Sequence, residues 1–138
     1  MTTVTADYQD RRQIVFEARG RTFTNVRALA TDGGPTDFTS TELLLIALGN
    51  CSLGSLLNHQ LLADTEVVRC AATLTARMAE FPTRVEHIDV AIELEVTDEA
   101  ILGHYPALEV DSCSCPTCNT LDGKVTSSLD LRVVSAQR

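Results

Sequence analysis

A run of sixteen mostly apolar residues, ELLLIALGNCSLGSLL at positions 42–57, limits the folds open to this chain. Just before it, Thr39 supplies a hydroxyl and Glu42 a carboxylate three residues later, which is the pattern of a capping box at a helix start. We therefore predict a long helix that runs to about Ala63. Its first two turns are apolar nearly all round, so most of its faces should be buried. A single small domain covers such a helix poorly, and we expect a homodimer with Leu43 to Leu62 near the subunit interface.

The segments around this helix show strand and turn patterns. Alternating or β-branched runs predict strands at 13–16, 22–29, 67–80, 85–96 and 126–134. Ala18 to Arg21 predicts a turn between the first two strands, and Phe81-Pro82-Thr83 joins the next two into a long hairpin. Short helices are expected at 98–105, where Pro106 should stop the helix, and at 116–121, ended near Gly123. This order of strands and helices predicts the α+β class.

Composition and charge narrow the range of functions. At 138 residues the chain fits one domain, 1–138. Its net charge of −8 opposes binding to nucleic acid. No apolar stretch follows a basic start, and the longest unbroken apolar run, Leu43 to Leu48, is too short to cross a bilayer. We therefore expect a cytoplasmic protein without a membrane partner. Its five cysteines then indicate catalysis or metal binding, because static disulfides are rare in a reducing compartment.

The cysteines fall in two places that are more than sixty residues apart. Cys51 lies in the apolar helical run, and Cys113, Cys115 and Cys118 lie in the stretch SCSCPTCNTL. The thiolate is both the peroxide-reactive and the metal-binding form of cysteine, so both chemistries are open. Cys115-Pro116-Thr117-Cys118 has the spacing of a redox CxxC, which can pass a disulfide outward. The alternative is a zinc site made by the three clustered thiols with Cys51 or His104, although the spacing lacks the paired CxxC layout of strong zinc signatures.

The pattern resembles the OsmC/Ohr family of thiol-dependent peroxidases over roughly residues 13 to 135. The residues that carry the resemblance are Glu42 to Leu45, Ala47 to Cys51 and Cys115-Pro116, with the Phe81-Pro82 turn between them. The resemblance implies an intertwined α+β homodimer with long central helices packed on antiparallel sheets. The family usually has a longer helix before the second cysteine, and here Pro106 and the run 109–112 predict that this helix is missing.

The resemblance also implies roles for individual residues. Cys51 would be the peroxidatic cysteine, attacking a peroxide oxygen to give a sulfenic acid, and Cys115 would resolve it to a disulfide. An arginine on an N-terminal loop would hold the thiolate; Arg19 is the nearest match by position, with Arg21 and Arg27 as alternatives. In the family a serine usually stands where this chain has Cys118, and Cys113 is extra. Both extra thiols are candidates for a disulfide relay that moves the oxidising equivalent to an accessible loop.

Glu42 is a further candidate for the thiol site. It lies nine residues before Cys51, which on one helix is about 13.5 Å of rise and about 180° of rotation, so the two side chains cannot meet within a helix. Glu42 would act from a partner subunit or through an arginine, and it also fits a helix cap.

The resemblance implies an organic hydroperoxide as substrate, a lipoyl-type or small dithiol as reductant, and no bound cofactor. The competing hypothesis is a thiol cluster that binds zinc or senses redox state without turnover.

Overall fold

The computed structural model describes residues 1–136 and divides the chain into two compact units, 1–43 and a second that begins at Leu44. The expectation of a single domain over 1–138 stays a prediction. Strands and helices are mixed, as the α+β prediction requires. The elements in chain order are β1 Thr5–Tyr8, β2 Gln13–Ala18, β3 Arg21–Val26, α1 Ser40–Leu57, η1 Gln60–Leu62, β4 Val67–Ala79, β5 Arg84–Val96, η2 Glu99–His104, α2 Tyr105–Cys113, α3 Pro116–Leu121 and β6 Thr126–Ser135.

The first unit is a three-stranded antiparallel meander in the order β1-β2-β3. Arg19 and Gly20 connect β2 to β3 with φ of 54° and 78°. Two consecutive positive φ values are what a two-residue hairpin turn of the primed type needs, so the predicted turn is confirmed. Phe16 and Phe23 stack across the hairpin with ring centroids 5.8 Å apart. The sequence reasoning missed β1, whose four residues are all exposed.

Hydrogen bonds to one buried amide fix the segment that leads into α1. Asn25 is 2% exposed, its Nδ2 donates to the carbonyl of Phe38 at 3.0 Å, and its Oδ1 accepts the Phe38 N–H at 3.1 Å. The capping box follows directly. The Thr39 N–H donates to Glu42 Oε1 at 2.8 Å, and the Glu42 N–H donates to Thr39 Oγ1 at 3.1 Å. These reciprocal bonds confirm the predicted helix start.

α1 ends earlier than the sequence predicts. The expected helix reaches Ala63, but α1 stops at Leu57 and a short 3₁₀ turn, η1, follows. His59 is extended, with ψ of 135°, and its Nδ1 accepts the Leu61 N–H at 3.1 Å. This side chain replaces a backbone acceptor at the start of η1, so the regular helix is interrupted there.

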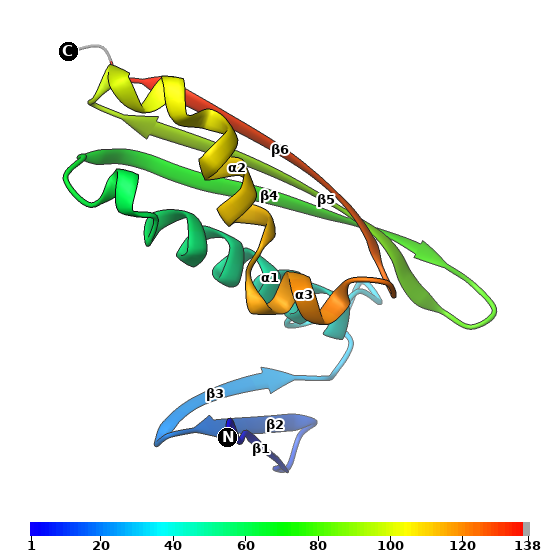
Figure 1. Ribbon diagram of the computed structural model, residues 1–138. Helices are drawn as coiled ribbons and strands as arrows, with labels where there is room; N and C mark the ends of the chain where they lie inside the picture. Colours follow the sequence, from blue (N-terminus) through cyan, green and yellow to red (C-terminus); the bar gives the residue numbers. More distant parts are fainter. Residues whose placement is uncertain (137–138) are drawn as a thin grey trace. The chain divides into compact units, whose positions relative to one another are not determined.

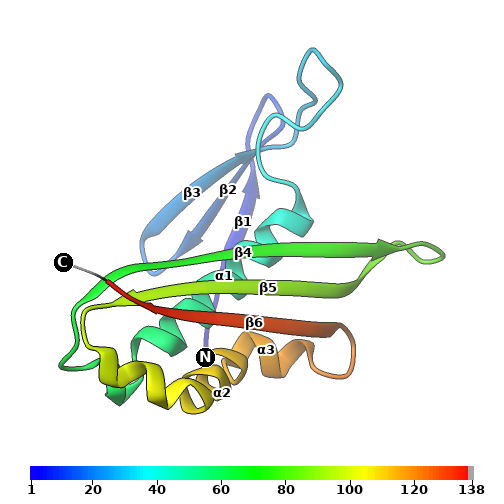
Figure 2. The same ribbon diagram turned by 90° about the horizontal axis from the view of Figure 1, so that it is seen from above.

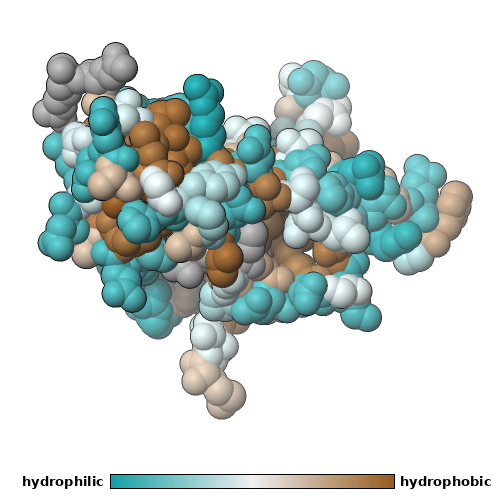
Figure 3. Space-filling view, turned by 45° about the horizontal axis from the view of Figure 1, so that its top comes forward, coloured by the Kyte–Doolittle hydropathy of each residue, from teal (hydrophilic) through white to brown (hydrophobic). Residues whose placement is uncertain are grey.

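α1 carries more apolar surface than the chain covers. By length and composition alone this helix could cross a membrane, although the core helix of a soluble protein passes the same test, and 22% of it is buried. The prediction from the six-residue apolar run overlooked this, because Gly49 and Asn50 interrupt the run without making the helix polar. Ile46 and Leu57 are exposed on it by 49% and 43%. The space-filling view shows apolar areas among the polar ones at the surface of the chain (Figure 3).

The second unit is built on the sheet β4-β5-β6, with β5 in the centre. β4 and β5 form the predicted antiparallel hairpin through Phe81 and Pro82, whereas β6 runs parallel to β5. The sheet is therefore mixed and not wholly antiparallel. A parallel neighbour needs a crossover connection, which here consists of η2, α2 and α3. These helices and α1 lie on the same face of the sheet (Figures 1 and 2).

The core of the second unit lies between this sheet face and the helices. From Ile88 to Val96 the β5 side chains alternate, and every second one is buried. They pack in one cluster with Leu48 and Leu56 of α1 and with Leu108 of α2. The buried face of β5 and the buried stripe of α1 thus pack together in one core.

The helix before the second cysteine is present, contrary to the prediction. Pro106 was expected to stop a helix, yet it is the second residue of α2, which continues through 109–112 to Cys113. Proline is tolerated in a first helical turn because the N–H it lacks would have no partner there. η2 ends at His104 and α2 starts immediately after it.

Candidate functional site

Cys115 and Cys118 lie side by side at the start of α3. Cys115 is the N-cap of this helix, with φ of −70° and ψ of 156°, and Pro116 occupies its first position. Cys115 Sγ accepts the Cys118 N–H at 3.3 Å and lies 2.8 Å from Cys118 Sγ. The two thiols are close enough to form a disulfide with little movement of the backbone. The predicted CxxC is therefore a paired dithiol, on the short helix that the sequence predicted.

Ser52 of α1 completes this group. Its side chain is 1% exposed, and its Oγ lies 3.9 Å from Cys115 Sγ and 3.8 Å from Cys118 Sγ. In each contact either the hydroxyl or the thiol can donate. A hydroxyl that touches both sulfurs can donate to whichever one is ionised. We call Ser52, Cys115 and Cys118 the dithiol site.

A cavity of about 630 Å³ opens beside the dithiol site, within the second unit. Ser52 and Cys118 are part of its wall, together with residues of α1, β5, α3 and the start of β6. Lys124, the only lysine of the sequence, also lines it, as does Asp122. The volume suits a small organic molecule. Its apolar lining residues are Leu48, Ile88, Val90, Leu121, Val125 and Leu129.

Cys51, the predicted nucleophile, does not join the dithiol site. It is half-buried on α1 and packs against the core cluster. The same core cluster includes Cys115, but among the described residues 1–136 no hydrogen bond joins Cys51 to Cys115 or Cys118. Ser52 is the next residue, and one step along an α-helix turns the side chain by about 100°. α1 therefore directs Ser52, and not Cys51, toward the two thiols.

The other predicted site residues lie elsewhere or outside the description. Arg19 is exposed in the β2–β3 hairpin, and Glu42 caps α1. Both belong to the first unit, where Arg21 and Arg27 are also exposed. The side chain of Cys113 lies outside those that the structure describes. The roles of these residues at a thiol site stay predictions.

The described part of the chain, residues 1–136, contains no group of three or more His, Cys, Asp or Glu side chains placed to hold a metal ion. The paired thiols and Ser52 supply two sulfur ligands and a neutral hydroxyl, which is short of the four-ligand set of a structural zinc site. His104 has no described contact with the dithiol site. The zinc hypothesis therefore finds no support in the geometry of the described side chains.

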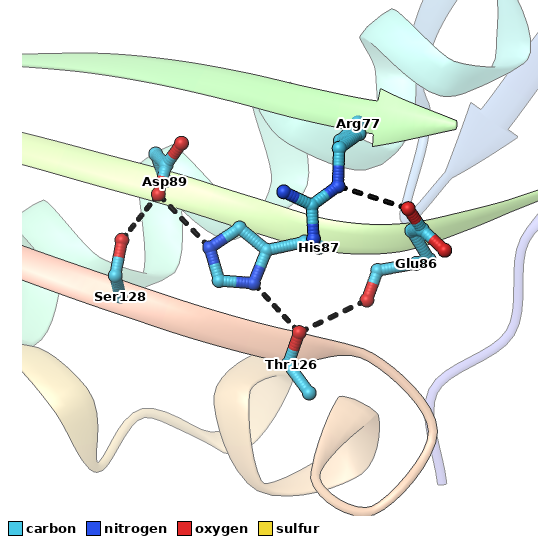
Figure 4. Close-up of polar contacts among 6 residues, drawn as sticks. All are labelled: Arg77, Glu86, His87, Asp89, Thr126 and Ser128. Carbon is cyan, nitrogen blue, oxygen red and sulfur yellow. Dashed lines mark hydrogen bonds and ion pairs between the residues drawn. The ribbon is translucent and has the colours of Figure 1, made fainter. Parts of the chain in front are cut away.

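A second polar cluster lies on the side of the sheet away from the helices (Figure 4). His87 Nδ1 is 2.6 Å from Thr126 Oγ1, and His87 Nε2 is 2.9 Å from Asp89 Oδ1. Ser128 also donates to Asp89 Oδ1. The hydrogen bond from Ser128, and after it the one from His87, lowers the pKa of Asp89. Arg77 pairs with Glu86 next to this cluster. Sequence reasoning missed these cross-strand contacts, which link β5 to β6.

Ser52 is the functional candidate that sequence reasoning missed. A signal was available, because Leu48, Ser52 and Leu56 recur every four residues and so lie on one helix face. All three are buried, with Leu48 at 3% and Leu56 at 0% exposed. A serine inside an otherwise apolar buried stripe needs a polar partner. The two sulfurs are that partner.

Comparisons with known proteins identify solved structures that share this fold. No protein-family model matches the sequence, and no curated protein matches it. Solved structures do match. An OsmC-like protein from Mycoplasma pneumoniae is 15% identical with a TM-score of 0.75, covering 99% of this chain and 98% of its own. An OsmC-like protein of unknown function from Vibrio cholerae is 10% identical with a TM-score of 0.70, covering 94% and 98%. The organic hydroperoxide resistance protein OhrB of Bacillus subtilis is 18% identical with a TM-score of 0.62, covering 96% and 98%.

These matches cover nearly the whole of both chains. The fold is therefore that of OsmC-like and organic hydroperoxide resistance proteins, as the resemblance predicted. At identities of 10 to 18% the likeness concerns the fold alone.

Proposed function

We propose that this protein is a thiol-dependent hydroperoxide reductase. The observation that supports the proposal most is the contact between Cys115 Sγ and Cys118 Sγ at 2.8 Å, beside a cavity of about 630 Å³. Two adjacent thiols can take up the two oxidising equivalents of one peroxide without a cofactor. The Bacillus subtilis protein of similar fold is named for organic hydroperoxide resistance, which supports the same chemistry.

The reaction balances with two thiols and one hydroperoxide. A thiolate attacks the terminal oxygen of ROOH, the O–O bond breaks, and the sulfur becomes a sulfenic acid while RO⁻ takes up a proton and leaves as ROH. The second thiol attacks that sulfur, the S–O bond breaks, and water leaves as the disulfide forms. The sulfurs together lose two electrons, and the peroxide gains them. A dithiol, lipoyl-type or small, then reduces the disulfide, and such a cycle belongs in a reducing compartment such as the cytoplasm.

The cavity favours an organic hydroperoxide as the substrate. Its wall combines apolar side chains, such as Ile88, Val90 and Leu129, with the sulfur-bearing Cys118. Apolar lining gains free energy by removing the carbon skeleton of a hydroperoxide from water, and the few polar groups fix its orientation. Hydrogen peroxide has no such skeleton and should be the poorer substrate.

A direct experiment tests the reaction. The reduced protein receives one equivalent of cumene hydroperoxide, and the intact mass is measured before and after under non-reducing conditions, with a metal assay on the same sample. A mass loss of two hydrogen atoms together with release of cumyl alcohol supports the proposal. Bound zinc and no mass change would instead support the metal-binding or redox-sensing alternative. The control is protein alkylated with iodoacetamide beforehand, which should consume no hydroperoxide.

We also propose that the chain works as a homodimer that covers α1. Ile46 and Leu57 lie exposed on a helix of which 22% is buried, and apolar surface of this kind marks an interaction site. Light scattering at micromolar concentration should give twice the mass of the chain. A stable monomer would contradict this.

A further inference from the structure

We propose that Cys118 is the thiol that attacks the hydroperoxide and that Cys115 resolves it, so that the catalytic disulfide closes within the CxxC and without Cys51. The assignment deepens the proposed function and rests on it. It reverses the order expected from the family resemblance, in which Cys51 on the long helix attacks and Cys115 resolves.

The two thiols of the pair differ in how easily a substrate can reach them. Cys118 is half-buried and lines the cavity, whereas Cys115 is 0% exposed and does not line it. A hydroperoxide that enters the cavity therefore meets the sulfur of Cys118 first. Oxidation of a cysteine follows thiolate character and access together. A fully buried thiol that does not line the cavity suits the resolving step, which needs no contact with the substrate.

The position of Cys115 fits the resolving role. Its Sγ lies 2.8 Å from Cys118 Sγ and is held there by the Cys118 N–H at 3.3 Å. A sulfenic acid formed at Cys118 thus has its resolving thiol in contact from the start. Attack within such a preformed pair avoids the entropy of bringing two groups together. Cys51, in contrast, has no described hydrogen bond to either sulfur.

Ser52 serves the pair as a positioning residue. Its hydroxyl is 3.8 Å from Cys118 Sγ and 3.9 Å from Cys115 Sγ, and burial at 1% exposure keeps water from competing for it. Donation to a sulfur that carries negative charge stabilises it, both when Cys118 attacks and when a thiolate leaves during reduction. The family resemblance directs attention to Cys51, but this chain brings a serine to the thiols from the same helix.

The reaction needs the two thiols, one hydroperoxide and a small dithiol as reductant. The Cys118 thiolate attacks the terminal oxygen of the hydroperoxide and the O–O bond breaks. Cys118 becomes a sulfenic acid, and the alkoxide takes up a proton and leaves as the alcohol. Cys115 then displaces water and forms the Cys115–Cys118 disulfide. A small dithiol such as dithiothreitol reduces this disulfide and restores both thiols.

The test maps oxidised sulfur by position. Reduced wild-type protein, Cys51→Ser, Cys115→Ser and Cys118→Ser each receive one equivalent of cumene hydroperoxide with dimedone, which traps sulfenic acids, and peptides are mapped by mass spectrometry without reduction. We expect a Cys115–Cys118 disulfide in the wild type and in Cys51→Ser, and a dimedone adduct at Cys118 in Cys115→Ser. Cys118→Ser should consume hydroperoxide no faster than alkylated protein. Cys70→Ser is the matched control, because this thiol lies on β4 away from the cavity wall.

Other outcomes overturn the assignment. An adduct at Cys51 in Cys115→Ser, a Cys51–Cys115 disulfide in the wild type, or a bond from Cys118 to Cys113 would each place the chemistry elsewhere. Wild-type protein that is folded by circular dichroism, fully reduced, and still inert toward hydroperoxide would refute the proposed function itself.

Ser52→Ala should slow hydroperoxide consumption and shift the reduction potential of the disulfide, measured against glutathione, while circular dichroism stays unchanged. An unaltered potential would remove Ser52 from the assignment.

Discussion

Replacing Gly54 of α1 by alanine should stabilise the protein. Alanine is favoured over glycine inside a helix by about 0.8–1 kcal/mol, and a Cβ at Gly54 meets no atom within 4 Å. No steric cost should therefore offset the gain in helix propensity. The free energy of unfolding should rise by about 1 kcal/mol and the melting temperature by roughly 4 °C. Urea unfolding at one fixed protein concentration measures it, since a dimer would make stability depend on concentration.

Gly49 is the matched control on the same helix. A Cβ there would lie 3.0 Å from Leu74 Cδ1 of β4, so Leu74 must shift, and overpacking of this kind typically costs about 1–3 kcal/mol. Gly49→Ala should thus be less stable than Gly54→Ala by about 1 kcal/mol or more. If Gly54→Ala destabilised the protein instead, the space beside it would be filled in solution, and a second copy packed on α1 would be the direct explanation.

Three further predictions concern the second unit. Leu56→Ala should lower the free energy of unfolding by about 2–5 kcal/mol in urea, because Leu56 is 0% exposed, whereas Val110→Ala, at a position 62% exposed, should change it by about 0.5 kcal/mol or less. The pKa of Asp89 is lowered, so its contribution to stability is present above the unfolded pKa and is lost as pH falls through the folded one; Ser128→Ala should raise that pKa in an NMR titration and weaken the acid dependence. Burial raises the pKa of Cys70, so at pH 8 iodoacetamide should label it more slowly in folded than in unfolded protein, and equal rates would contradict this.

Local chemistry made part of this structure predictable. The capping box of Thr39 and Glu42, the hairpin turn at Arg19 and Gly20, and the break at Phe81-Pro82 each depend on a few neighbouring residues. Such signals act over short distances and need no knowledge of the packing. The strong alternation of 85–96 likewise predicted β5, since one of its faces is buried from Ile88 to Val96.

Other features depend on contacts that the sequence does not display. Whether Pro106 ends a helix or begins one depends on where the helix starts, and η2 shifts that start to Tyr105. The direction of β6 is set by the path of the crossover, not by its own alternation. Whether Cys51 or Ser52 faces the two thiols depends on how α1 is rotated about its axis against the sheet and α3. The buried stripe of α1 indicates this rotation, whereas the cysteine motif does not.

The short separation of the paired thiols has a consequence for the durability of the protein during turnover. A Cys115–Cys118 bond closes a loop of only four residues, 115 to 118, whereas a Cys51–Cys115 bond would close one of 65 residues, 51 to 115. In the chain-entropy description the first restrains the unfolded chain by about 2 kcal/mol and the second by about 4 kcal/mol. A local bond thus leaves oxidised and reduced forms closer in stability, and the molecule can alternate between them many times without passing through a markedly weaker form.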